Sequence, residues 1–256
     1  MSASQLIITA LDGIPMVRPR EDLPRLLIEA LDRRAITLRD RDVLVVTQKI
    51  VSKAEGRYLD LATVEPTAKA KELAQITLKD ARLVQAILSE TVEVLRAKPH
   101  VLIVATRHGV VLANAGIDQS NLDAADRNRR VLLLPEAPDA SAQRIKERLD
   151  RHFGADIGVI ISDSAGRAWR LGTVGLAIGA AGLPALWDRR GEPDLSGRPL
   201  EVTEVGFADA IAAAAVLAMG EAAEGRPAAH VRGLQWQAEA RPATALVRPK
   251  AEDLFR

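Results

Sequence analysis

A short polar segment at residues 114–121 carries side chains that suit a divalent cation. Its small residues and Gly116 let the backbone turn tightly and approach a ligand closely. Asp118 and Asn121 follow the end of an expected strand, where the hard oxygen ligands of a cation are often placed. The same segment could be a plain Asx-rich surface turn, and the residues alone leave both interpretations open.

An acidic segment at residues 162–167 offers a second position for a cation or a nucleotide. Asp163 comes just after the apolar run 159–161, and an acid at the tip of a buried strand is a common binding position in α/β proteins. Arg167 and Arg170 are candidates for clamping phosphate oxygens. The alternative is an N-cap aspartate followed by two surface arginines, but the apolar run before it favours a functional site.

Two further segments combine charge with glycine. Residues 48–57 bring Lys49 and Lys53 close to the end of an expected strand, where they can bind a polyphosphate or form a solvated basic turn. Residues 219–226 end an Ala-rich helix and, taken alone, are typical of an ordinary helix C-terminus with glycine. The chain has no G-x-x-x-x-G-K-[ST] segment and no G-x-G-x-x-G after a strand, so a bound nucleotide would not use a Walker or Rossmann loop.

The composition narrows the chemistry further. The 256 residues include no cysteine, which excludes disulfides, thiolate zinc sites, iron–sulfur clusters and a cysteine nucleophile. The four histidines lack H-x-x-x-H spacing, and no G-x-S-x-G segment supports a Ser-His-Asp triad. Lys and Arg number 35 against 34 Asp and Glu, and only 3% of residues are aromatic, which argues against a nucleic-acid partner. Without a signal peptide or a spanning apolar stretch, we expect a cytoplasmic protein that does not bind a membrane.

The apolar patterns predict a mixed α/β (α+β) fold. Strands are expected at residues 6–9, 43–46, 101–105, 110–113, 131–134 and 158–161, with a turn at 107–109. Helices are expected at residues 23–31, 66–74, 81–95 and 208–219, and another is expected to be capped by Ser141 and to run to Phe153. The chain after Arg241 is expected at the surface.

The four polar segments occur together with Gly13-Ile14-Pro15 and residues 174–179 in an order that resembles the coenzyme F-420 gamma-glutamyl ligases. The similarity runs from about Leu6 to Leu234, and it is the ordered set, not any single piece, that is specific. The resemblance implies two interleaved α/β subdomains within residues 1–245, followed by a C-terminal tail at 246–256. It also implies a homodimer.

The activity that the resemblance implies is that of a GTP-dependent carbon–nitrogen ligase. Such an enzyme phosphorylates the terminal carboxylate of the deazaflavin precursor F-420-0 and then joins L-glutamate through its amine, with further gamma-linked glutamates as an option. The family implies two divalent ions, Mg²⁺ or Mn²⁺, and K⁺ is an additional candidate. This chemistry suits the residues, because phosphoryl transfer needs positive charge around the γ-phosphate more than it needs a base.

The resemblance also assigns functions to individual positions. Asp118 and Asp163 would be catalytic and would hold one metal, while Ser164 and Glu221 would hold the second. Asn121 would contact GTP. The other implied GTP contacts are Ile14, Pro15, Met16, Val17, Gln48, Lys49, Lys53, Met219, Gly220, Ala222, Ala223, Glu224, Gly225 and Arg226.

Two other functions remain open at this point. One is a different metal-dependent acid–amine ligase on the same fold, with another acyl substrate. The other is a nucleotide- or cofactor-binding protein without turnover. The joint presence of Asp118, Asp163 and Glu221 disfavours the second, because a binding protein does not need all three carboxylates.

Overall fold

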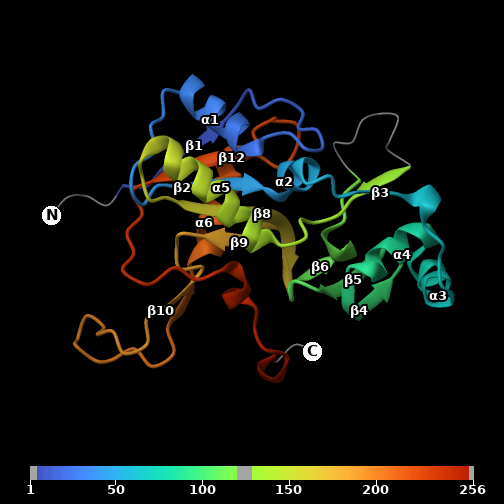
Figure 1. The fold of residues 1–256 in the computed structure, drawn as a ribbon. Helices are drawn as coiled ribbons and strands as arrows, with labels where there is room; N and C mark the ends of the chain where they lie inside the picture. The colour runs from blue at the N-terminus through green and yellow to red at the C-terminus, as the bar shows by residue number, and fades with distance from the viewer. Residues whose placement is uncertain (1–4, 120–128, 254–256) are drawn as a thin grey trace.

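A five-stranded mixed sheet forms the centre of the computed structural model, which describes residues 5–119 and 129–253. The strand order is β1-β12-β2-β8-β9, and only the pair β2 and β8 is parallel. The C-terminal strand β12 therefore lies between two strands from the N-terminal part of the chain (Figure 1). The strands are β1 (Ile7–Leu11), β2 (Val43–Thr47), β8 (Gly158–Arg167), β9 (Arg170–Ala181) and β12 (Ala228–Arg232).

Helices cover both faces of this sheet. On one face, α1 (Leu23–Arg33) and α5 (Pro138–Phe153) pack over a core that includes Leu44 and Val46 of β2. On the other face, α6 (Phe207–Met219) packs over Val43 and Val45 of the same strand. Side chains alternate across a strand, so successive residues of β2 face opposite helical layers. Because both layers are apolar, every one of these residues is apolar.

The Ala-rich helix α6 lies unusually close to the sheet. Its small side chains leave room for strand β9, where Gly175 faces the helix backbone. A Cβ atom at Gly175 would lie 2.4 Å from the carbonyl oxygen of Ala212, so only glycine fits without moving the helix. Gly175 therefore has a packing function in this layer, whereas Gly179 packs against Pro138 of α5.

A second, smaller α/β unit is formed by part of the chain between β2 and β8. Its antiparallel sheet has the order β4-β5-β6 and is covered by α3 and α4, with a core of its own. In Figure 1 this unit lies beside the central sheet, and the chain enters and leaves it through the antiparallel pair β3 and β7. Its elements are β3 (Tyr58–Asp60), α3 (Ala68–Thr77), α4 (Ala81–Ser89), β4 (Thr91–Lys98), β5 (Val101–Thr106), β6 (Val111–Ala113) and β7 (Arg130–Leu132).

The remaining elements are short. Helix α2 (Gln48–Ala54) follows β2 directly, and β10 (Leu186–Asp188) pairs with β11 (Glu204–Gly206). Turns of 3₁₀ helix occur at Leu61–Thr63, Asn114–Gly116, Ala243–Leu246 and Lys250–Glu252. None of the helices in the described part of the chain is both long enough and apolar enough to span a membrane.

The mixed α/β class is confirmed, and most expected elements are present with slightly different ends. The helix expected at 81–95 is wrong in its second half, because α4 ends at Ser89 and Thr91 begins strand β4. The β-branched residues after Glu90 favour a strand, and β4 pairs with β5 along its length, with two register irregularities. The sequence pattern also gave no indication of α2, β3, β9, β10, β11 or the central strand β12.

The expectation for the start of one helix is wrong, and the surface position expected for the chain after Arg241 is confirmed except at Ala243. Ser141 does not cap α5, which already begins at Pro138, where the fixed φ of proline suits the first helical position. The Ser141 hydroxyl instead donates to the Glu55 carboxylate, and it also lies 3.2 Å from the carbonyl oxygen of Ala137. The segment after Arg241 is partly anchored, because Ala243 is buried and its N–H donates to the Asp139 carboxylate at 2.8 Å.

Candidate functional site

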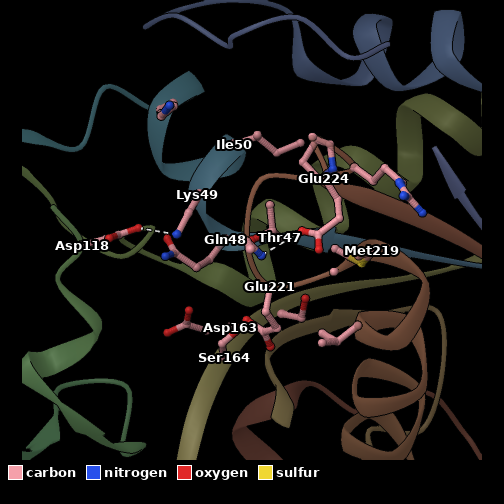
Figure 2. Close-up of a pocket in the computed structure, with 18 of the residues that line it drawn as sticks. Thr47, Gln48, Lys49, Ile50, Asp118, Asp163, Ser164, Met219, Glu221 and Glu224 are labelled. Carbon is pink, nitrogen blue, oxygen red and sulfur yellow. Dashed lines mark hydrogen bonds and ion pairs between the residues drawn. The ribbon is translucent and has the colours of Figure 1, made fainter. Parts of the chain in front are cut away.

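A cavity of about 580 Å³ lies where β2 ends and α2 begins, against the middle of β8 and the loop after α6. Ligands of α/β sheets commonly bind beyond the carboxyl ends of parallel strands, and the cavity lies at that end of β2. Figure 2 shows side chains from α2, from the β8 hairpin and from the 219–226 loop pointing toward one another here.

The structure brings together in this cavity all the predicted site residues that it describes. They come from positions spread over most of the chain, and Asn121 lies outside the described residues. Those that line the cavity are Ile14, Pro15, Met16, Val17, Gln48, Lys49, Lys53, Asp118, Asp163, Ser164, Met219, Gly220, Glu221, Ala222, Ala223, Glu224, Gly225 and Arg226.

The basic side of the cavity is a helix and not the solvated turn that was the alternative for residues 48–57. Gln48 and Lys53 are buried, at 1% and 5% exposure. The hydroxyl of Ser52 donates to Oε1 of Gln48 at 3.0 Å and fixes that amide in place. A buried ammonium is costly unless anionic or polar groups surround it, so Lys53 marks a place where negative charge is stabilised.

The acidic side of the cavity contains two carboxylates from distant parts of the chain. Nζ of Lys49 lies 2.7 Å from Oδ2 of Asp118 (Figure 2). Asp163 keeps some exposure to the cavity, but the surrounding protein removes much of its water, and this desolvation raises its pKa to about 6. The nearby Asp118 carboxylate raises the pKa further, while the Ser164 N–H, Lys49 and Gln48 oppose the increase. The two carboxylates thus repel each other across a gap that Lys49 only partly neutralises.

The sequence predicted that Asp163 and Ser164 follow the end of a strand, but both lie within one. Strand β8 continues through both residues to Arg167 and pairs with β9 in a long hairpin, with a register irregularity between Ile161 and Ser162. The N-cap alternative for Asp163 is therefore wrong as well. Arg167 and Arg170 lie at the end of this hairpin and are not among the residues that line the cavity.

The loop after α6 closes the cavity from the other side. Oγ of Ser164 donates to Oε2 of Glu221 at 2.6 Å, which ties this loop to the β8 hairpin. The loop also folds on itself, since the Glu224 carboxylate accepts the N–H of Ala222 at 2.8 Å. This turn requires Gly220, whose φ is +84° and whose Cβ, if present, would lie 2.3 Å from Cδ of Glu224.

The donor groups of the cavity suit cations that arrive together with a phosphate-bearing ligand. Within residues 5–119 and 129–253, no three His, Asp or Glu side chains form a metal-binding cluster. The oxygen donors instead come as two pairs: Asp118 and Asp163 both line the cavity, and Ser164 is hydrogen-bonded to Glu221. Mg²⁺ commonly uses one or two protein carboxylates and completes its shell with substrate phosphates and water, so these pairs fit such an ion.

Several residues that line the cavity were not predicted as contacts. Gly116 and Ile117 belong to the segment that presents Asp118, and Ser162 precedes Asp163, so their place in the sequence was a usable signal. Thr47, Ile50, Ala113, Val216 and Pro227 also line the cavity, and nothing in their residue types indicated this.

The fold and the cavity have the features of a small-molecule enzyme of the mixed α/β class that combines carboxylates with lysines and uses no Walker or Rossmann loop. Sequence comparison identifies the family. The chain belongs to the F420-0:Gamma-glutamyl ligase family, whose sequence model matches residues 13–233. The family predicted from the ordered motifs is thereby confirmed.

Curated relatives match over nearly the full length of the chain. The coenzyme F420:L-glutamate ligase of Methanothermobacter thermautotrophicus is 43% identical over 254 residues, covering 97% of this chain and 98% of the relative. That of Methanopyrus kandleri is 45% identical over 244 residues, covering 94% of this chain and 93% of the relative. The ligase of Haloarcula marismortui is 45% identical over 231 residues, or 88% and 86% of the two chains.

Proposed function

We propose that this protein joins L-glutamate to the terminal carboxylate of the deazaflavin precursor F420-0, using GTP to activate the carboxylate. Membership of the family and the names of its full-length relatives support the glutamate ligation. One structural observation supports this site: the predicted segments between Ile14 and Arg226 meet in one cavity, whose lining includes both carboxylates and lysines.

The reaction would proceed in two steps. A carboxylate is a poor acylating agent, so its oxygen first attacks the γ-phosphorus of GTP, which forms an acyl phosphate and releases GDP. The amine of glutamate then attacks the acyl carbon, phosphate leaves with the bonding electron pair, and the amine loses a proton as the amide forms. The first step depends mainly on placing positive charge around the transferred phosphoryl group.

The chain would provide this charge in two ways. Asp118 with Asp163, and Ser164 with Glu221, would hold two divalent cations, which neutralise charge on the phosphates when bound. Lys53 would add a fixed positive charge from α2. The Ile14–Val17 segment and the loop after α6 would enclose the nucleotide, since both line the same cavity.

The proposal also includes a homodimer, as the family resemblance implies. Active sites that use both subunits would lose activity when the subunits separate. Sedimentation at assay concentrations tests this part, and a fully active monomer would contradict it.

A single assay tests the activity itself. The protein is incubated with F420-0, GTP, L-glutamate and Mn²⁺, and the deazaflavin product is analysed by mass spectrometry. We expect the addition of one or more glutamyl residues that depends on GTP and on the metal. GTP-dependent phosphate release with another acid, but without glutamylated deazaflavin, would support a different acid–amine ligase. Nucleotide binding without any phosphate release would support a binding protein.

A further inference from the structure

The ion pair between Lys49 and Asp118 lies at the position where the proposed function requires a divalent cation. Nζ of Lys49 lies 2.7 Å from Oδ2 of Asp118, and the Lys49 charge also acts on Asp163. The two side chains retain 32% and 16% of their exposure, so the ammonium is at the edge of the cavity and not sealed in the core. One positive charge therefore faces a pair of carboxylates that repel each other.

Of the two partners, Asp118 is held in place by its backbone. Its N–H donates to the carbonyl of Leu132 at 3.0 Å, and its own carbonyl accepts the N–H of Leu132 at 2.9 Å. This isolated bridge to strand β7 fixes the position from which the carboxylate points into the cavity. Lys49, in contrast, holds its charge at the end of a flexible four-carbon stem, so it is the partner that can move.

We propose that Lys49 is a built-in counter-ion, which holds the place of a divalent cation between Asp118 and Asp163 until the cation binds and displaces it. This inference rests on the proposed function, because it assumes that these carboxylates bind a metal. An ammonium and a divalent cation repel each other strongly at contact distance, so both cannot occupy this gap. A cation that enters the metal-free protein must first break the ion pair.

The displaced ammonium then needs a new partner, and a bound phosphate would be one. Metal binding without nucleotide should thus be weak, whereas metal and nucleotide should strengthen each other's binding. Such coupling is reciprocal, so it is measurable from either side. The ion pair would in this way reduce the negative charge of the site when it is empty and make it accept the metal and the nucleotide together.

The test measures Mn²⁺ binding to the nucleotide-free protein by calorimetry and by the electron paramagnetic resonance of free Mn²⁺. Lys49→Met keeps the length of the side chain and removes its charge. We expect it to bind Mn²⁺ about tenfold more tightly than the unmodified protein, the order of one charge-assisted contact that no longer has to be broken. The nucleotide should then improve Mn²⁺ affinity less than it does in the unmodified protein.

Two variants serve as controls. Lys250→Met removes a lysine from an ion pair of the same length, with 2.7 Å between Lys250 Nζ and Glu93 Oε2, outside the cavity. It should leave Mn²⁺ affinity unchanged. In an Asp118→Asn background, Lys49→Met should lose most of its effect, because the two side chains then no longer form the pair.

Unchanged or weaker Mn²⁺ binding by Lys49→Met would overturn the inference. Circular dichroism checks the fold first, and if this variant is unfolded at the assay temperature, Lys49→Gln is titrated in its place with the same criterion. The outcome is independent of the ligase assay. Tighter Mn²⁺ binding by the variant together with no glutamylation by the unmodified protein would contradict the proposed function but support the counter-ion function of Lys49. Normal glutamylation by the unmodified protein with no change in the Mn²⁺ affinity of Lys49→Met would contradict only the function assigned to Lys49.

Discussion

Asparagine at position 163 should stabilise the metal-free protein while it abolishes ligation. Asn keeps the shape of the side chain but removes a charge that the site disfavours. A rise of the Asp163 pKa from 3.8 to about 6 corresponds to about 3 kcal/mol in favour of the neutral form. Because the side chain keeps some exposure and water screens its charge, we expect Asp163→Asn to gain about 1 to 2 kcal/mol. In a chain of this size that raises the melting temperature by about 3 to 6 °C.

The pH dependence identifies the cause of this gain. A carboxylate whose pKa is raised by folding destabilises the native state where it is ionised, which is above about pH 6. The penalty disappears as the pH falls toward its ordinary value of 3.8, where the group is protonated in both states. The difference in melting temperature between Asp163→Asn and the unmodified protein should therefore be largest at pH 7 and above and should vanish near pH 4.

The assay pairs thermal melts in a chelator with melts in saturating Mn²⁺ and with turnover. Mn²⁺ should stabilise the unmodified protein more than the variant, because ligand binding to the native state adds to its stability. Asp32→Asn, at an exposed position of α1, is the matched control and should change neither quantity. A variant that melts lower than the unmodified protein in chelator, or that keeps most of its turnover, would refute this reasoning.

Three further predictions concern other parts of the molecule. Lys53→Ala should weaken GTP binding about ten- to a hundredfold, as expected for the loss of a charge-assisted contact of about 1.5–3 kcal/mol, and calorimetry with GTP checks this. Gly220→Ala should weaken GTP binding at least as much as Lys53→Ala does, because the added Cβ meets Glu224 and disturbs the loop. The melting temperature should fall little, because this loop lies at the surface. Burial by itself would raise the pKa of Asp42, but this pKa is lowered overall by Arg232, which donates to the carboxylate at 2.6 Å, and by the neighbouring His230. Asp42→Asn should therefore cost about 3 kcal/mol at pH 7, and the difference should shrink as the pH falls below about 4, as melts over pH 3 to 7 would measure.

Sequence patterns predicted β2 and α6 but missed β12, which is also buried and has Val231 as its one β-branched residue. Strand β2 is covered on both faces and α6 packs a row of small residues against the sheet, so the apolar run and the Ala-rich run each have one interpretation. Residues 81–95 were misassigned because the apolar spacing of α4 continues into β4, and only the pairing with β5 separates them. The β8–β9 hairpin was missed for a related reason, since glycine and serine in its middle are typical of turns.

The site was more predictable in its members than in its geometry. The order of the motifs indicated which segments belong together, and the structure places their described residues around one cavity. The ion pair of Lys49 with Asp118 could not be predicted, because the partners are far apart in the sequence and meet only through the return of the chain at β7. The helical form of residues 48–54 depends likewise on packing that local propensity does not report.

The position of β12 between β1 and β2 has a consequence for the synthesis of the protein. Until the last strand of the central sheet has left the ribosome, β1 and β2 lack their shared neighbour, and each presents unpaired backbone groups along one edge. The loop that closes the cavity immediately precedes this strand in the chain. Completion of the central sheet thus depends on one late, long-range pairing step, which slows folding. Stalled or truncated products should be inactive and prone to associate through these open strand edges.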